Sequence, residues 1–249
     1  MLYSQTLEKL RALRLEGIAA ALEEQRRQPD MAHLEFEERL GLLIERQWLW
    51  KENRGLTARI KAAQFKLNAS LEDLDYRPTR GLKRAQIEQL RASRWVTDHR
   101  NCLVTGSTGT GKTFLGCALA LQACRDGHRV LYFYAPKFFR LLESARADGS
   151  LFQFFKKLAR TPLIVIDDLG ISTVSGSLYR EFLEMLDDRL GQGATLITSQ
   201  FPVNQWHQTI ADATVADAIL DRLAHNSYRI ELKGESMRKP KTPPADTQP

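Results

Sequence analysis

One stretch of the chain has the residue types and spacing that phosphate binding requires: Gly106, Ser107, Thr108, Gly109, Thr110, Gly111, Lys112 and Thr113. It fills every fixed position of the pattern G-x-x-x-x-G-K-[ST]. Small residues let such a loop curl until its N–H groups converge on phosphate oxygens, at the start of a helix whose dipole favours anions. The lysine reaches the β- and γ-phosphates, and the last hydroxyl binds Mg²⁺. We expect all eight residues to bind a nucleotide, with Lys112 also catalytic and Thr113 also a metal ligand.

The flanking residues favour a phosphate site over the other interpretation of this motif, a glycine-rich turn with a surface lysine. Residues 101–105 are predicted to form a short buried strand, and residues 114–124 a buried helix. Strand, loop and helix in this order are what a phosphate-binding loop requires.

A pair of carboxylates follows the apolar strand predicted at residues 163–166. Asp167 would lie at the carboxyl end of that strand, where folds with this loop hold Mg²⁺, so we expect it to be the Walker B metal ligand. Asp168 is expected to polarise the attacking water, a task that glutamate performs in many ATPases. Aspartate is one methylene shorter. The alternative is a turn-forming pair before Gly170.

Two further polar groups are candidates for the γ-phosphate. Gln200 follows the predicted strand of residues 194–198, at the same sheet edge, and could bind the γ-phosphate or the attacking water. Phosphoryl transfer also gains from a cation at the γ-phosphate, often supplied by a neighbouring subunit. Arg222 is the best candidate, with Arg189 and Arg180 next, although each could instead form a surface salt bridge.

Strands and helices alternate from residue 101 onward. Near-continuous apolar strands are predicted at 101–105, 130–134, 163–166, 194–198 and 228–232, with helices between them. This alternation predicts an α/β fold, a parallel sheet with helices on both faces. Residues 234–249 turn to Lys, Pro and Thr and are predicted to be a disordered tail.

The first hundred residues read as helical, and their charge is unevenly placed. Apolar residues recur at helical spacing up to Pro29 and resume at Phe36, and further helical segments are predicted at 56–67 and 82–95. Residues 1–45 carry six Lys/Arg against nine Asp/Glu, whereas residues 46–100 carry thirteen against six. The basic excess predicts a surface for DNA phosphates, although solvated helix faces are the alternative. The candidate contacts are Arg54, Arg59, Lys61, Lys66 and Arg84.

Composition agrees with a globular ATPase. The 249 residues are 43% hydrophobic and 27% charged, with a net charge of +6. No apolar run approaches the ~20 residues of a membrane span, and the first residues do not form a signal peptide. Cys102, Cys117 and Cys124 lack metal-binding spacing and are expected to be reduced packing residues. We therefore expect a cytoplasmic protein without a membrane partner.

The ordered segments GSTGTGKT, LIVIDDLG, LITSQ and AILDRL closely resemble the AAA+ branch that contains the IstB transposition helpers and the DnaC-type helicase loaders. The stretches LRLEGIAAALEEQ, AQFK and LEDLDY favour IstB. The resemblance implies ATP and Mg²⁺ as cofactors, homo-oligomers with ATP between neighbours, duplex DNA, and the transposase encoded beside the protein. By position, Gln200 matches the sensor and Arg222 the trans-acting or sensing arginine. It also implies a helical DNA- and partner-binding domain (1–70), a basic connector (71–100) and an AAA+ core (101–233).

Two other functions are weighed against DNA remodelling for a transposase. A helicase loader would use its N-terminal helices to bind a hexameric helicase and would prefer single-stranded DNA. The basic excess in residues 46–100 favours the transposition role. A small-molecule kinase would need a substrate pocket with a basic lid, and no segment of the sequence indicates one.

Overall fold

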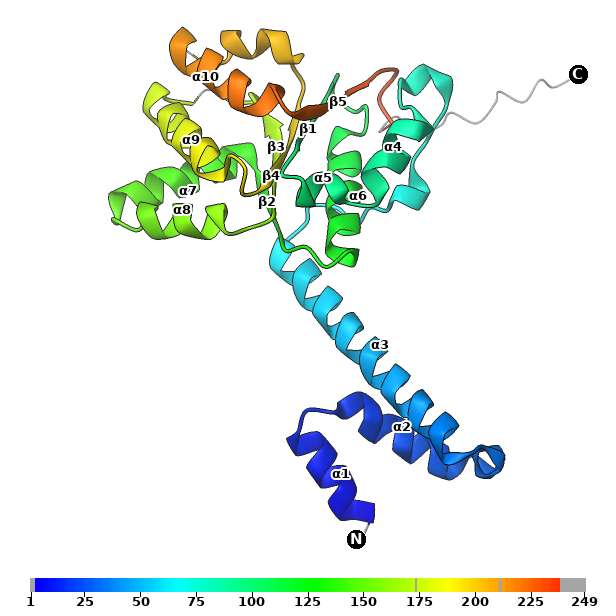
Figure 1. Ribbon diagram of the computed structural model, residues 1–249. Coiled ribbons are helices and arrows are strands. Elements are labelled where there is room, and N and C mark those ends of the chain that lie inside the picture. The colour runs from blue at the N-terminus through cyan, green and yellow to red at the C-terminus, as the bar shows by residue number, and fades with distance from the viewer. Residues whose placement is uncertain (1–2, 173, 211, 238–249) are drawn as a thin grey trace, which may run out of the picture. The chain divides into compact units, whose positions relative to one another are not determined.

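The computed structural model describes residues 3–172, 174–210 and 212–237 (Figure 1). The chain divides into two compact units, Met1–Ala58 and Arg59–Pro249. This division lies within a helix, before the boundary at residue 70 that the sequence suggested. Residues 71–100 belong to the second unit.

The first unit consists of helices. These are α1 (Tyr3–Ala12), α2 (Glu16–Arg27), the 3₁₀ turn η1 (Pro29–His33) and most of α3 (Phe36–Ala63). Gly17 lets α2 approach α3 closely, because a Cβ there would lie 2.6 Å from the Cα of Gln47. Ion pairs join Arg11 to Glu23 and Arg46 to Glu24.

Two helix boundaries in this region differ from the sequence-based prediction. Residues 36–48 and 56–67 were expected as separate helices but form the single helix α3 up to Ala63, because Gly55 alone does not break a helix. The first helix is split at Arg14, whose φ of 60° lies in the left-handed region.

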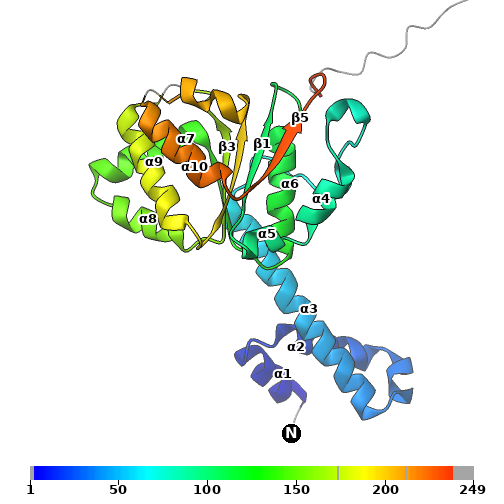
Figure 2. The same ribbon diagram turned by 45° about the horizontal axis from the view of Figure 1, so that its top comes forward.

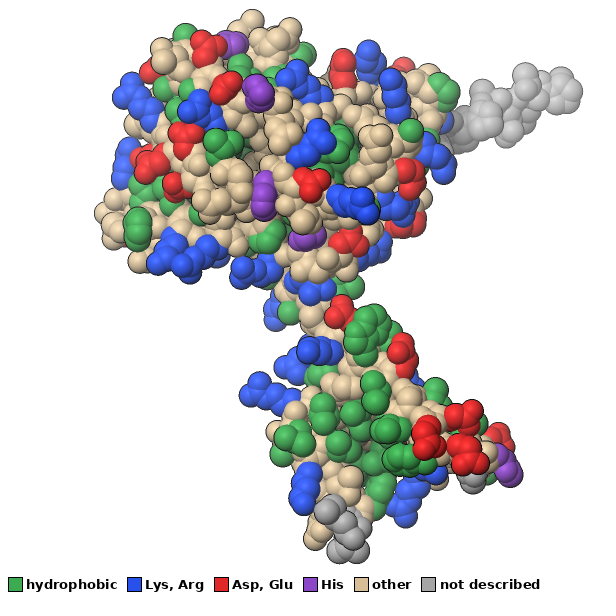
Figure 3. Space-filling model, in the orientation of Figure 1, with side chains coloured by type: hydrophobic (Ala, Val, Ile, Leu, Met, Phe, Trp, Pro, Cys, Tyr) green, Lys and Arg blue, Asp and Glu red, His purple; other side chains and the backbone are tan. Residues whose placement is uncertain are grey.

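An apolar stripe on α3 is exposed within the first unit. Phe36, Leu40, Ile44 and Trp48 follow one another at four-residue spacing and are 40–71% exposed. Their periodicity predicted a packed face, and the structure leaves it in solvent. Figure 3 shows hydrophobic side chains gathered on this unit.

Residues 64–100 pack against the core of the second unit. They form η2 (Leu71–Asp73), η3 (Pro78–Arg80), α4 (Arg84–Arg91) and α5 (Arg94–Thr97). Leu71, Leu90 and Trp95 are buried. The helix expected over 82–95 is divided at Ser93, whose φ is 51°.

The second unit is built on a five-stranded parallel sheet. Its strands are β1 (Asn101–Gly106), β2 (Val130–Tyr134), β3 (Leu163–Leu169), β4 (Ala194–Ser199) and β5 (Ser227–Leu232), in the order β2-β3-β4-β1-β5. The predicted fold class is confirmed. Because all strands run the same way, their carboxyl ends meet at one edge.

Helices cover both faces of the sheet (Figure 2). The helix α6 (Lys112–Arg125) packs on one face, where Gly116 allows contact with Leu196 and Thr198. The other face carries α7 (Ala135–Ala147), α8 (Leu151–Ala159), α9 (Gly176–Arg189) and α10 (Ala213–Ala224), with η4 (Val203–Gln208) before α10. Phe138, Phe139 and Phe182 form edge-to-face pairs in this core, with centroids 5.7–6.0 Å apart.

The cysteines were expected to be reduced packing residues, and no membrane span was expected. Cys102, Cys117 and Cys124 are free and buried, and burial raises the pKa of the Cys102 thiol to about 12. In the described part of the chain, none of the helices combines the length and the apolar composition of a membrane span.

Candidate nucleotide site

The glycine-rich loop joins the end of β1 to the start of α6, and three of its positions require glycine. Gly106, Gly109 and Gly111 have φ values of 147°, 84° and 90°. A Cβ on Gly106 would also lie 2.3 Å from the carbonyl oxygen of Leu232 on the neighbouring strand. The loop therefore has the conformation of a phosphate cradle, and side chains at these three positions would prevent it.

Lys112 lies folded over this loop. Its side chain is buried and its Nζ donates to the carbonyl oxygen of Ser107 at 2.9 Å. The Thr110 hydroxyl donates to the same oxygen at 2.8 Å. The ammonium thus lies where the curled loop would hold β- and γ-phosphates.

Asp167 is fully buried and receives hydrogen bonds from three elements. Thr113 Oγ1 of α6 lies 3.1 Å from its Oδ2, and Tyr132 Oη of β2 lies 2.7 Å from the same oxygen. Thr198 Oγ1 of β4 donates to Oδ1 at 2.6 Å. Burial, and then the bond to Asp167, raises the pKa of Tyr132 above its usual range, so its hydroxyl remains a donor.

Asp168 has an unusual backbone conformation beside this carboxylate. Its φ is 62°, and its amide donates to Thr198 Oγ1 at 2.8 Å. Thr198 therefore connects both aspartates, since it also donates to Asp167. Asp168 lines the pocket in front of the loop.

Lys66, expected among the DNA contacts, lies at this centre. Its Nζ is 3.7 Å from Asp167 Oδ2 and 3.8 Å from Asp168 Oδ2, and 4.7 Å from the centroid of the Tyr134 ring. The segment that follows α3 brings it there, which the charge pattern of the sequence did not indicate.

Gln200 reaches the phosphate loop directly. Its Oε1 accepts a hydrogen bond from the Thr108 hydroxyl at 2.8 Å. The predicted sensor position is thus in contact with the loop whose occupancy it would detect.

A pocket of 340 Å³ opens in front of the loop and is lined by both polar and apolar side chains. Lys112, Thr113, Asp168 and Gln200 are among the polar ones. The apolar lining comes from Leu67, Leu74, Leu82, Leu232 and Met237. Leu74, Asp73 and Asp75 belong to the LEDLDY segment, for which no site role was predicted from the sequence.

Arg80 is a further site residue that the sequence analysis missed. Its side chain is buried, lines the pocket, and donates from Nη2 to the carbonyl oxygen of Thr110 in the loop. No local pattern marks it, because Arg80 is 30 residues from Thr110 in the sequence. Tyr132 gave a weak signal, as a hydroxyl within an apolar strand.

The segment after β5 also touches the loop. The amide of Met237 donates to the carbonyl oxygen of Gly109 at 2.9 Å, and Ser236 packs on Gly109. Residues 234–237 of the expected disordered tail are therefore in contact with the core, and residues 238–249 lie outside the described residues.

Arg222 is not brought to the loop within this chain. Its Nε pairs with Asp187 at 2.8 Å, and its carbonyl oxygen accepts from Asn101, the first residue of β1. Since β1 leads from Asn101 to the loop at its other end, the main chain of Arg222 lies one strand length, roughly 17 Å, from the loop.

The two other arginines considered have partners of their own within the chain. Arg189 is buried and donates to the carbonyl oxygens of Leu158, Thr161 and Ala194, and burial lowers its pKa to about 10. It therefore acts in packing and cannot reach a neighbouring subunit. Arg180 is exposed and pairs with Asp212 at 3.2 Å.

The remaining basic candidates lie in separate places. The Arg54 guanidinium stacks on Trp50 at 5.1 Å in the first unit, and that of Arg84 stacks on Tyr76 at 4.6 Å in the second. Lys61 is exposed on the last turn of α3. Arg59 Nε donates to the carbonyl oxygen of Cys124 at 2.8 Å.

The arrangement fits a nucleotide with Mg²⁺. Within the described ranges, no three His, Cys, Asp or Glu side chains form a metal cluster of their own. A Mg²⁺ ion usually takes one or two protein oxygens and completes its shell with phosphates and water. The adjacent oxygens of Thr113 and Asp167 are suited to that role.

The bridging hydroxyl gives a stability prediction. Thr198→Val removes the partner of both Asp167 Oδ1 and the Asp168 amide, and should lower the free energy of unfolding of the second unit by about 1–3 kcal/mol. Urea denaturation measures this loss. Thr198→Ser keeps the hydroxyl and is the control. Equal stability of the valine variant and wild type would show that these bonds do not hold the two aspartates.

Sequence comparison identifies related proteins over almost the whole chain. A model of the family described as "IstB-like ATP binding protein" matches residues 8–245. An insertion sequence ATP-binding protein of Sinorhizobium fredii, y4pL, is 43% identical over 239 residues, covering 96% of this chain and 98% of the relative. The ATP-binding protein of insertion sequence IS21 from Pseudomonas aeruginosa is 28% identical over 229 residues, 92% of this chain and 86% of the relative.

Solved structures show the same architecture. The crystal structure of DnaI superposes with a TM-score of 0.56 at 25% identity, covering 67% of this chain and 92% of that one. The crystal structure of the DnaC helicase loader gives 0.54 at 19% identity, covering 69% and 100%, and shows likeness of fold alone. The second unit thus has the P-loop fold of AAA+ proteins. By the match over residues 8–245, the chain belongs to the family of IstB-like ATP-binding proteins.

Proposed function

We propose that this protein is a Mg²⁺-dependent ATPase that assembles on duplex DNA, remodels it, and recruits the transposase of its insertion sequence. The observation that carries the proposal is the hydrogen bond between Thr113 and Asp167, beside a loop whose conformation requires glycine at three positions. The names of the relatives supply the insertion sequence context.

The mixed lining of the pocket suggests how ATP is held. The phosphates would lie in the loop from Gly106 to Thr113, with the adenine among the leucines around Leu74. Bound Mg²⁺ would supply charge neutralisation at the phosphates, held by Thr113 and Asp167. Lys66 lies next to that position, and its ammonium could move toward the negative charge of bound phosphates.

Hydrolysis would depend on two polar groups at the pocket. Asp168 would accept a proton from the attacking water, and Gln200 would orient that water or contact the γ-phosphate. Arg222 would act on the nucleotide of a neighbouring subunit, since its own loop is distant within the chain.

An exposed apolar stripe and several basic side chains support the assembly and DNA-binding parts of the proposal. The exposed stripe of Phe36, Leu40, Ile44 and Trp48 offers apolar area of the kind that marks protein interfaces, here with another copy or with the transposase. Arg54, Arg59, Lys61 and Arg84 remain candidates for DNA phosphates. We place this activity in the cytoplasm, where the element's DNA is.

A helicase-loader function is the second candidate, because the solved DnaC helicase loader shares this fold over its whole length. It requires binding of a hexameric replicative helicase by the first unit and a preference for single-stranded DNA. A pull-down with that helicase separates the two: capture favours the loader, and its failure with tight duplex binding favours the transposition role.

The first functional prediction concerns nucleotide binding. Lys112→Ala should abolish ATP-dependent binding to duplex DNA, because the ammonium over the loop is lost. Affinity for a fluorescent ATP analogue and for labelled DNA measures both steps. Lys137→Ala, at an exposed position of α7, is the matched control. ATP-dependent DNA binding that survives in the Lys112 variant would mean that nucleotide is not the switch.

The second concerns hydrolysis. Asp168→Asn keeps the size of the side chain, and asparagine tolerates the left-handed backbone. Since general-base assistance is typically worth 10²–10⁴-fold, we expect kcat to fall about 100-fold while ATP affinity stays near wild type. Phosphate release under saturating ATP measures kcat. A kcat close to wild type would remove Asp168 from the proposed role.

A further inference from the structure

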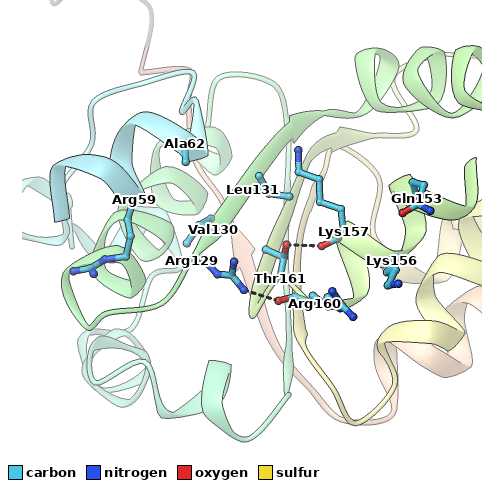
Figure 4. Close-up of a pocket in the computed structure, with 10 residues that line it drawn as sticks. All are labelled: Arg59, Ala62, Arg129, Val130, Leu131, Gln153, Lys156, Lys157, Arg160 and Thr161. Atoms are coloured by element: carbon cyan, nitrogen blue, oxygen red, sulfur yellow. Dashed lines mark hydrogen bonds between the residues drawn. The ribbon is translucent and has the colours of Figure 1, made fainter. Parts of the chain in front are cut away.

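A second cavity, of 620 Å³, lies at the start of β2 (Figure 4). Five of its lining residues are basic and none is acidic: Arg59, Arg129, Lys156, Lys157 and Arg160. Three segments distant in sequence supply them, namely the end of α3, the start of β2 and the end of α8. Figure 3 shows Lys and Arg side chains along the lower margin of the second unit.

Main-chain carbonyl groups hold two of these arginines in place. Arg59 Nε donates to Cys124 at the end of α6, and Arg129 Nη2 donates to Arg160 after α8 at 3.2 Å. A guanidinium has five N–H donors, so one such bond orients the group and leaves donors for a second acceptor. The hydroxyl of Thr161 donates to Lys157 at 2.8 Å and fixes the end of α8.

The cavity differs from the rest of this unit in its charge balance. Several exposed arginines elsewhere in the second unit are paired with carboxylates, such as Arg91 with Glu72 and Arg146 with Glu181. Among the described residues, the ion pairs involve none of the five cavity cations. Like charges gathered without carboxylates repel one another, and an anion that lies among them relieves this repulsion.

The form of the cavity fits an extended anion. The five cations come from three separate segments, and the Arg59 side chain points away from the others in Figure 4, so together they suit an acceptor with several phosphates rather than one. A DNA duplex carries one charge per ~1.7 Å of its axis and so presents several phosphates to such a surface. Flexible lysines and partly held arginines contact phosphates without reading bases.

From this geometry we propose that the cavity binds the sugar–phosphate backbone of duplex DNA, a site that rests on the proposed function and gives it a location. Val130 and Thr161 line the cavity close to the start of β2 and β3, whereas the nucleotide loop lies at the carboxyl ends of the strands. ATP and DNA can therefore be bound by one subunit at the same time.

The test is the double variant Lys156→Gln/Lys157→Gln, at two exposed positions. Binding of a labelled mixed-sequence duplex is measured by anisotropy from 50 to 200 mM salt, with a non-hydrolysable ATP analogue. Each phosphate contact contributes about 0.9 to the slope of log K against log[salt]. We expect the slope to fall by about two and the affinity at 0.1 M salt to fall roughly 10- to 100-fold. ATP-analogue affinity should remain unchanged.

Two further variants serve as controls. Lys137→Gln/Arg140→Gln removes the same charge from exposed positions of α7 and should leave the slope near wild type. Lys156→Arg/Lys157→Arg keeps the charge and should retain binding. An equal loss in the α7 variant would overturn the inference, because it would make the effect one of overall charge.

The outcomes also separate this inference from the proposed function. If wild type binds duplex DNA and the glutamine variant keeps its affinity and slope, the cavity is not a DNA site and only this inference fails. Binding of labelled polyglutamate is measured on the same proteins. If the glutamine variant loses polyglutamate binding but keeps its DNA binding, the inference is likewise overturned, in favour of an acidic protein partner. Failure of wild type itself to bind duplex DNA overturns the proposed function.

Discussion

The buried carboxylate of Asp167 is the group on which the geometry of the site depends. Removing a carboxylate from water is costly unless hydrogen bonds and charges replace the lost hydration. Thr113, Tyr132 and Thr198 replace it from a helix and two strands, and Lys66 approaches from the segment after α3. The sheet order β2-β3-β4 is what brings these groups to one point. A change in that order would leave the charge without partners.

Local motifs allowed much of this site to be predicted from the sequence. The loop from Gly106 to Thr113 and the strand before Asp167 are continuous stretches, so their chemistry can be read without knowing the fold. Tyr132 and Arg80 could not be assigned this way. The first reaches the site because β2 pairs with β3, and the second because η3 packs beside the loop. Such neighbours are properties of topology rather than of spacing.

Helix ends and exposed faces were predicted less well, for two physical reasons. Ser93 and Arg14 interrupt helices because their backbone is left-handed, and neither is a glycine or proline that would have indicated a break in the sequence. Helical periodicity around Phe36 and Trp48 identifies an apolar face but not what covers it, and in this chain the face lies in solvent. Charge density alone suggested Lys66 as a DNA contact, and the structure places its ammonium beside the carboxylates of Asp167 and Asp168.

The contacts of the last strand have a consequence for how the protein is made. Gly106 fits against the carbonyl group of Leu232, and Gly109 is bonded to Met237, so the loop acquires its shape only beside residues more than 120 positions later. On a ribosome, the helices of the first unit can form early, since domains fold as they emerge. The nucleotide loop must wait until translation has passed residue 237. A nascent chain that has not reached this point lacks both of these contacts to the loop.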